Sequence, residues 1–211
     1  MLKNLDSLIF DMDGTLWDNV NSYVKVWNHG FEQLGFDKRV DRKELIGLMG
    51  MEAQQLLDAV LPDASMEEQD QLFNIVVDAY DKMIPNIQPE VFPGVIEGLE
   101  KLSKKYKLFL LSNCEEGGLV NFMEHTQTRH LITDYREHGQ NLQPKNVNLR
   151  LLMEKHKLQS TAYVGDTDGD AYQTELAGIP FVFVDYGFGE TDNYAIKFSS
   201  FKDLTDYFLN E

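Results

Sequence analysis

The chain has 211 residues, 43% of them hydrophobic and 26% charged, which is typical of a globular protein with one medium-sized domain and room for an insertion. It has 19 Lys and Arg against 35 Asp and Glu, a formal net charge of −16, so nucleic acid is not expected as a partner. No apolar run approaches the ~20 residues of a membrane span, the N-terminus lacks a signal pattern, and the single Cys114 excludes an internal disulfide. These features predict a cytoplasmic protein with no membrane partner.

Short apolar runs alternate with helical periodicity along the chain. We expect buried strands at residues 7–10, 108–111, 131–135, 162–164 and 181–184, the third of them with the weakest pattern. Strands separated by helices indicate an α/β protein with a mostly parallel sheet that is covered by helices on both faces.

The segment between the first two strands is too long for a simple crossover. It holds roughly 90 residues, where a crossover needs only about a dozen or more. We therefore expect an all-helical cap domain at residues 18–89, inserted into a core that is formed by residues 1–17 and 90–211.

Helix signals recur inside this insertion. Apolar residues at 20–34 have helical spacing, with Asn19 available as the N-cap and Gly35 as the stop. Capping-box spacings begin at Asp41 and Ser65, and the helical signal stops at Pro85. The segment at residues 47–52, which contains two glycines and two methionines, is expected to link two cap helices.

Polar side chains follow three of the expected strands. In a parallel sheet all strands end on the same edge, so residues that follow different strands can converge there. The first strand is followed by Asp11 and Asp13, and the second by Ser112 and Asn113. A lysine precedes a helix expected near Val147, and an acidic loop follows the fourth strand; the residues concerned are Lys145, Asp166, Asp168 and Asp170.

These motifs, in this order, resemble those of the haloacid dehalogenase-like hydrolase superfamily. The first motif matches Asp11 and Asp13, the second Ser112, and the third Lys145; the fourth matches Asp166 with Asp170. Residues 93–95 and 187–189 are similar to its phosphoglycolate phosphatase-like branch. The resemblance covers the whole chain and implies a Rossmann-like, three-layer parallel sheet with a helical cap. Asn146 departs from the pattern, since relatives usually have proline after the lysine.

The chemistry of phosphoryl transfer gives each motif a role. Asp11 would attack phosphorus and form an aspartyl-phosphate, and Asp13 would protonate the leaving oxygen and later activate water. Ser112, Asn113 and Lys145 would bind the phosphoryl group, whose transition-state charge needs fixed positive partners.

Mg²⁺ is the expected cofactor, because it prefers hard oxygen ligands and keeps several waters. Asp11 and Asp166 are the expected direct carboxylate ligands. By resemblance to the family, Asp13 adds its backbone carbonyl and Asp170 supports the metal from further away. Asp168 is expected to have a turn role, and Cys114 is expected to be a packed thiol.

The expected activity is therefore Mg²⁺-dependent hydrolysis of a small phosphate monoester, such as phosphoglycolate or a sugar phosphate. Asp13 disfavours dehalogenases and phosphonatases of the superfamily, which lack this acid. A β-phosphoglucomutase-like mutase is the alternative, although Tyr23 and Met51 or Glu52 stand where its cap histidine and arginine would be. A non-catalytic binding protein on the same fold is a further alternative. The oligomeric state and the particular ester are not determined by these motifs.

Overall fold

The computed structural model describes residues 2, 4–83, 86 and 88–211, and the chain divides into two compact units. The first unit contains residues 1–17 and 91–211, and the second contains residues 18–90. The chain passes between them through two short strands that pair with each other, β2 (Trp17–Asp18) and β3 (Glu90–Val91). The predicted stop at Pro85 lies outside the described residues.

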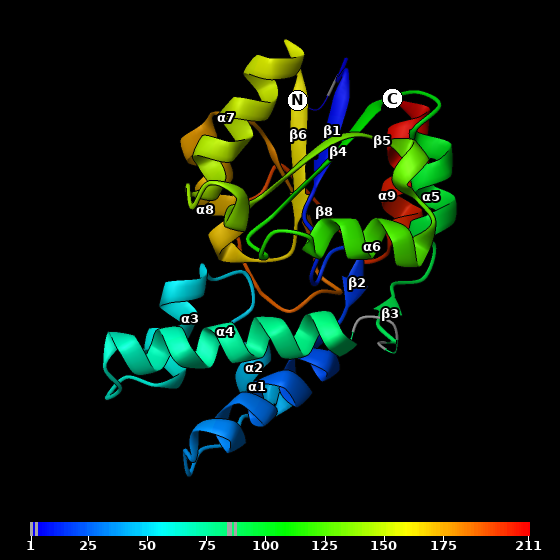
Figure 1. The fold of residues 1–211 in the computed structure, drawn as a ribbon. Coiled ribbons are helices and arrows are strands. Elements are labelled where there is room, and N and C mark those ends of the chain that lie inside the picture. Colours follow the sequence, from blue (N-terminus) through cyan, green and yellow to red (C-terminus); the bar gives the residue numbers. More distant parts are fainter. Residues whose placement is uncertain (1, 3, 84–85, 87) are drawn as a thin grey trace. The chain divides into compact units, whose positions relative to one another are not determined.

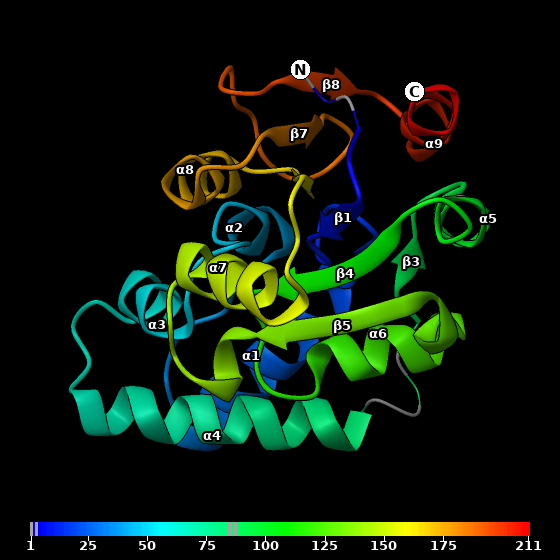
Figure 2. The ribbon, with the colours of Figure 1, turned by 90° about the horizontal axis from the view of Figure 1, so that it is seen from above.

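The first unit is built on a parallel sheet whose strand order is β5-β4-β1-β6-β7-β8 (Figure 2). All five expected strands are confirmed, and the third extends further than expected. A short sixth strand that the sequence analysis missed, β8, pairs with β7 at the edge. The strands are β1 (Ser7–Phe10), β4 (Lys107–Ser112), β5 (Ile132–Glu137), β6 (Thr161–Gly165), β7 (Phe181–Val184) and β8 (Ile196–Phe198).

Helices cover both faces of this sheet (Figure 1). On one face lie α7 (Lys145–His156) and α8 (Asp168–Ala177), which pack against each other. On the other lie α5 (Val95–Leu102), α6 (Gly118–Thr126) and α9 (Phe201–Asn210). Two short 3₁₀ helices flank β5, η2 (Arg129–Leu131) and η3 (His138–Gln140). The expected three-layer α/β class is confirmed.

The central strand β1 explains where polar residues can gather. Its four residues are fully buried, because β4 and β6 pair with it on either side and helices cover both faces. The chain continues from β1 to β4 on one side and later returns to β6 on the other. A parallel sheet opens a crevice at the carboxyl ends of its strands where the strand order reverses in this way.

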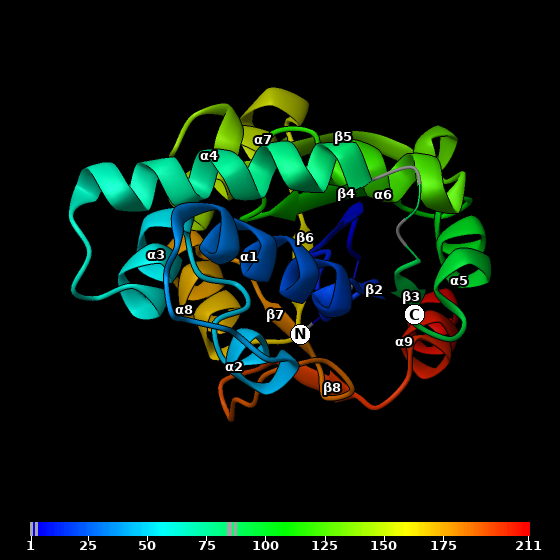
Figure 3. The same ribbon diagram turned by 60° about the horizontal axis from the view of Figure 1, so that its bottom comes forward.

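Between Asp18 of β2 and Glu90 of β3, the regular elements of the second unit are helices among its described residues (Figure 3). Its helices are α1 (Val20–Leu34), α2 (Arg42–Ile46), α3 (Ala53–Val60) and α4 (Met66–Met83). α1 and α4 pack together at Gly30, where an added Cβ would lie 2.7 Å from Leu72 Cδ1. No described helix of either unit is long and apolar enough to cross a membrane.

The helix ends of this unit test the capping predictions. Gly35 ends α1 with φ +71°, and the reciprocal box of Ser65 and Glu68 is present at the start of α4. Asn19 is the N-cap residue of α1, as predicted, but its side chain makes no capping hydrogen bond. Its amide donates instead to Tyr80 Oη at 2.7 Å, and Asp18 accepts from the N–H of Val20.

Candidate active site

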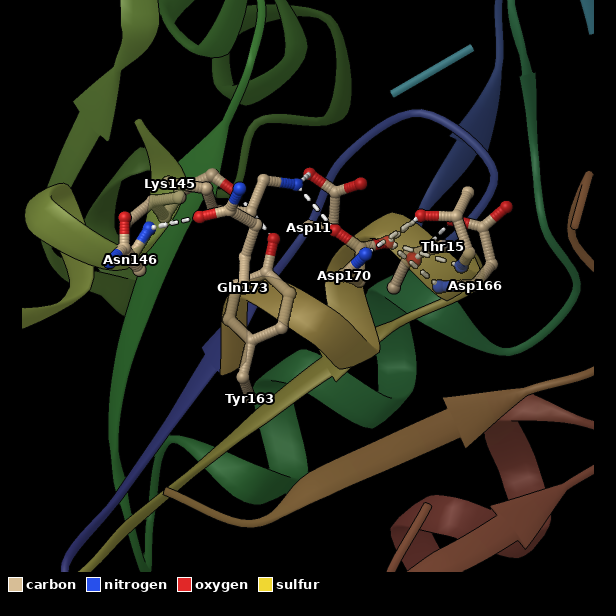
Figure 4. A network of polar contacts seen from close by, with 10 residues as sticks. Asp11, Thr15, Lys145, Asn146, Tyr163, Asp166, Asp170 and Gln173 are labelled. Carbon is tan, nitrogen blue, oxygen red and sulfur yellow. Dashed lines mark hydrogen bonds and ion pairs between the residues drawn. The ribbon is translucent and has the colours of Figure 1, made fainter. Parts of the chain in front are cut away.

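Four buried charged side chains meet at the carboxyl ends of β1 and β6 (Figure 4). The ammonium of Lys145 donates to Asp11 Oδ1 at 3.2 Å and to Asp170 Oδ1 at 2.5 Å. Asp11, Asp166 and Asp170 each offer a carboxylate oxygen, and these oxygens all lie within 4.8 Å of one another. Residues separated by more than 150 positions in the sequence thus form one cluster, which we call the acidic cluster (Asp11, Asp166, Asp170) with its lysine.

Lys145 reaches the cluster from the first position of α7. The predicted helix start near Val147 is wrong, because the helix begins at Lys145, directly after Pro144. Proline at this place cannot donate a hydrogen bond, but the N-cap position does not require one. Its Nζ lies over the ring of Tyr163, 5.3 Å from the ring centroid, so the buried ammonium contacts an aromatic face in addition to the carboxylates.

Asn146, at which relatives usually have proline, has a specific partner. Its backbone N–H donates to Gln173 Oε1 at 3.1 Å, so one of the first N–H groups of α7 is satisfied by a side chain of α8. A proline has no such donor. The departure therefore changes how α7 is tied to α8, whereas Lys145 keeps its contacts with the carboxylates.

Asp170 is held by the start of α8. Its Oδ2 accepts from the N–H of Asp166 at 3.3 Å, the N–H of Thr167 at 3.2 Å and the hydroxyl of Thr167 at 2.8 Å. Thr167 in turn accepts from the N–H of Asp170, which completes a reciprocal cap. Both carboxylate oxygens of Asp170 therefore have partners within the core, Oδ1 in Lys145 and Oδ2 in the donors at the start of α8.

Asp166 is held by two loops. Its Oδ1 accepts from the Thr15 hydroxyl at 3.2 Å, and its Oδ2 accepts from the N–H of Phe188 at 2.7 Å. The loops approach so closely that an added Cβ would lie 2.0 Å from Asp166 Oδ2 at Gly14 and 2.4 Å from Asp166 Cβ at Gly187. Only glycine fits at these two positions.

The loop at residues 186–189 was missed as a part of the site. From the sequence, its glycines indicated only a resemblance to the family. In the structure it supplies the Phe188 donor, and the Tyr186 hydroxyl donates to the carbonyl of Thr15 at 2.9 Å. The glycine on either side of Phe188 was the available signal for a loop that approaches another backbone.

The pKa values of Asp11 and Asp166 are shifted because the three carboxylates of the cluster are buried and only one ammonium, that of Lys145, balances their charge. Burial raises the pKa of Asp11 to about 6, although Lys145 opposes the shift. Burial, followed by the charges of Asp170 and Asp11, raises the pKa of Asp166. Burial disfavours the charged form of Lys145, but Asp11 and Asp170 outweigh it and raise the lysine pKa. Three carboxylates against one ammonium leave a site that a divalent cation would stabilise.

Asp13 stands apart from the acidic cluster. Its side chain is partly buried, and Oδ1 accepts from the indole Nε1–H of Trp17 at 2.9 Å. The group of carboxylates close enough to share a metal does not include it. Trp17 could not be recognised as a partner of Asp13 from the sequence, in which it is an apolar residue that follows the motif.

Ser112 and Asn113 lie at the same sheet edge. Ser112 is the buried last residue of β4, which is paired in parallel with β1, and Asn113 follows it in a partly buried position. The register pairs Phe10 with Leu110, so Ser112 extends beyond the level at which Asp11 leaves β1. Asp168, for which a turn role was expected, is the exposed first residue of α8.

Cys114, for which a packed thiol was expected, is half-buried. Burial, together with the nearby charge of Glu137, raises the pKa of the thiol well above its ordinary value. Glu137 itself is buried and accepts from the N–H groups of Gly117 and Leu119 at the start of α6. A protonated thiol is a poor nucleophile.

The donor set fits a hard divalent cation such as Mg²⁺. The shared oxygens are all carboxylate oxygens, and they carry more negative charge than Lys145 balances. Magnesium is bound in proteins by one or two carboxylates together with waters, which suits Asp11 and Asp166 as its ligands.

The chain is similar to known proteins along most of its length. The model of the family described as "Haloacid dehalogenase-like hydrolase" matches residues 8–184. A phosphoglycolate phosphatase of Rhodobacter capsulatus is 26% identical, with 94% of each chain covered. A phosphoglycolate phosphatase of Mesorhizobium japonicum is also 26% identical, over 90% of this chain and 86% of the relative.

Solved structures share the fold along nearly the entire chain. A protein described as a predicted phosphoglycolate phosphatase from Haemophilus somnus has a TM-score of 0.84 and 20% identity, covering 99% of this chain and 100% of its own. A haloacid dehalogenase-like family hydrolase from Streptococcus pneumoniae has a TM-score of 0.83 and 21% identity, covering 97% of this chain and 98% of its own.

Proposed function

The chain belongs to the haloacid dehalogenase-like hydrolase family, and we propose that it is a Mg²⁺-dependent phosphatase that hydrolyses a small phosphate monoester through an aspartyl-phosphate on Asp11. The single observation that carries this proposal is the position of Lys145. Its buried ammonium lies between Asp11 and Asp170, with Asp166 in the same cluster. A structural ion pair would need one partner, and three buried carboxylates around one lysine favour the binding of further positive charge.

Asp11 is the proposed nucleophile. It follows the central strand β1, and Lys145 holds its Oδ1. A carboxylate in this position attacks phosphorus, the phosphorus–oxygen bond to the leaving alcohol breaks, and the phosphoryl group remains on Asp11. Water then attacks phosphorus, which releases inorganic phosphate and restores the carboxylate.

Lys145 serves both the nucleophile and the transferred group. It fixes the direction of the Asp11 side chain, and its positive charge lies beside the oxygens on which negative charge accumulates. Ser112 and Asn113, at the end of the adjacent strand β4, are the proposed polar contacts for the remaining phosphoryl oxygens.

Asp13 is the proposed general acid and base. It would give a proton to the leaving oxygen and take one from the attacking water. Asp13 lies two residues from Asp11 and outside the acidic cluster, so in this proposal one carboxylate transfers protons while others serve the metal.

The metal would be held by the Asp11 and Asp166 side chains and by the Asp13 carbonyl, with Asp170 keeping the cluster in place. When bound, it supplies positive charge that lets an anionic ester approach three carboxylates. Thr15 and Phe188 contribute by fixing the direction of Asp166 before the metal binds.

The proposed substrate is small, with phosphoglycolate as the first candidate. Relatives that cover most of this chain carry the name phosphoglycolate phosphatase. We propose that the helical unit at residues 18–90 is the cap domain that selects the ester, and that the enzyme acts in the cytoplasm, where its single Cys114 stays reduced.

The test is hydrolysis of a panel of phosphate esters by the purified chain, with phosphate release as the readout. The panel contains 2-phosphoglycolate, several sugar phosphates and p-nitrophenyl phosphate, each with Mg²⁺ and with chelator. We expect turnover that needs Mg²⁺ and that disappears in Asp11→Asn. We also expect the wild-type protein to take up a ³²P label from the substrate, in a bond that is stable in acid.

Three results would contradict the proposal. Turnover at the wild-type level in Asp11→Asn would exclude the aspartyl-phosphate. Interconversion of sugar phosphates without phosphate release would indicate the mutase. An absence of turnover over the whole panel, with ligand binding retained, would indicate a non-catalytic binding protein.

A further inference from the structure

Trp17 is placed where it can control the proposed general acid. A tight turn follows β1, in which Gly14 has φ +82° and its N–H donates to the carbonyl of Trp17 at 2.9 Å. The backbone N–H groups of Leu16 and Trp17 both donate to the carbonyl of Met12. The backbones of Asp13 and Trp17 also form an isolated β-bridge. The turn brings two side chains that are four residues apart into contact, with indole Nε1 2.9 Å from Asp13 Oδ1.

The indole is itself fixed. Trp17 is fully buried, and its ring packs edge-to-face with Phe122 of α6 at 5.3 Å between centroids. The imidazole of His125, one turn further along α6, lies beside the same indole, with 6.3 Å between the ring centroids. A donor that is held by packing in the core presents its N–H in one direction, so it restricts the rotation of the carboxylate that accepts from it.

The chemistry of the indole makes this contact selective between the two oxygens of Asp13. The Trp N–H can only donate, so Oδ1 is an acceptor in both protonation states of the carboxyl group. An oxygen that accepts from a fixed N–H serves as the carbonyl oxygen of the protonated form, and the proton then resides on Oδ2.

We infer that Trp17 is a positioning residue for catalysis: its indole N–H holds Asp13 Oδ1 so that Oδ2 delivers the proton to the leaving oxygen of the ester. In that step the Oδ2–H bond breaks, the proton goes to the departing oxygen, and Asp13 is left as a carboxylate that still accepts from Trp17. This inference rests on the proposed function, since it assigns a role within the same reaction.

The test is the dependence of kcat/KM on the leaving group in Trp17→Phe. Phenylalanine keeps the buried aromatic ring and its packing against Phe122, but it has no N–H. The rate constant kcat/KM includes only the steps up to the transfer of the phosphoryl group to Asp11, so the later attack of water does not enter. Alkyl phosphates need protonation of the leaving oxygen, whereas 2,4-dinitrophenyl phosphate releases a stable anion.

We expect the ratio of kcat/KM for the dinitrophenyl ester to that for the alkyl ester to rise by about 10- to 100-fold in Trp17→Phe, because general acid help is worth about 10²–10⁴-fold. Asp13→Asn should shift the ratio in the same direction and further. In the double variant, Trp17→Phe should add nothing to the shift that Asp13→Asn already causes, since the indole acts only through Asp13.

Trp27→Phe is the matched control, because it removes the N–H of the other, buried tryptophan in α1. It should leave the ratio at the wild-type value. The inference is overturned if Trp17→Phe lowers kcat/KM for both esters by the same factor, if it has no effect, or if it shifts the ratio equally with and without Asp13. A wild-type protein that hydrolyses neither ester would instead refute the proposed function.

Discussion

Removal of the Asp11 charge should stabilise the metal-free protein, even though it should abolish turnover. Burial raises the pKa of Asp11 from 3.8 to about 6 in the folded state. Between these values the folded protein binds more protons at this residue than the unfolded chain does, so stability falls as the pH rises through the window. One pKa unit corresponds to about 1.4 kcal/mol, so ionised Asp11 lowers the free energy of unfolding by about 3 kcal/mol at pH 7.5 and by about half as much at pH 5.

Asparagine has nearly the same shape and does not ionise. We therefore expect Asp11→Asn to raise the free energy of unfolding by about 1–3 kcal/mol at pH 7.5 in the presence of chelator. The range extends below the full value because an amide reproduces the protonated carboxyl only in part. Lys145 keeps Asp170 as its partner at 2.5 Å, so the substitution does not leave the ammonium without a carboxylate.

Urea unfolding followed by circular dichroism measures this difference at pH 7.5 and at pH 5. Asp192→Asn is the control, because Asp192 is an exposed loop residue of the same unit. Its change should be close to zero at both pH values. If Asp11→Asn brings no gain, or a gain that is equal at pH 7.5 and pH 5, then the buried charge of Asp11 is not a source of instability and this reasoning is wrong.

Three further predictions concern the same site. Mg²⁺ should raise the melting temperature more at pH 7.5 than at pH 5, because protons compete for Asp11 and Asp166, whose pKa values are raised; equal shifts in differential scanning fluorimetry would contradict this. Lys145→Met should lower kcat by about 100-fold or more and the free energy of unfolding by about 3 kcal/mol or more, since two buried carboxylates lose their cation; turnover near the wild-type level would exclude the proposed role. Gly187→Ala should weaken Mg²⁺ binding, measured by calorimetry, and lower kcat by about 10-fold or more, because its Cβ would displace Asp166. Its control is Gly169→Ala in α8, where an added Cβ meets nothing closer than 3.6 Å.

Much of the fold could be predicted because its physical causes are local in the sequence. A strand that is buried on both faces must be a continuous apolar run, and this predicted β1, β4, β6 and β7. The long interval between the first two strands could only be an insertion, and helix stops such as Gly35 were readable because a left-handed residue favours glycine. The convergence of Asp11 and Asp166 followed from the rule that parallel strands end on one edge.

The features that escaped prediction depend on partners that are distant in the sequence. β8 has only three residues, one of them Lys197, and it is a strand because β7 offers an edge to pair with. Asn19 occupies the N-cap position of α1, but its side chain donates to Tyr80, 61 positions away, and makes no capping hydrogen bond. Sequence periodicity carries no information about such contacts.

The same division holds within the candidate site. Its acidic residues and Lys145 were recognisable from residue type and order, since phosphoryl chemistry needs those groups. Their environment was decided only by tertiary structure: burial without a balancing charge, which raises the pKa of Asp11, and the loop that gives Phe188 N–H to Asp166. The contact of Trp17 with Asp13 spans only four residues, yet it depends on a turn at Gly14 and on packing against α6. Residue types are local properties, whereas desolvation and the direction of a hydrogen bond are set by every segment that packs around them.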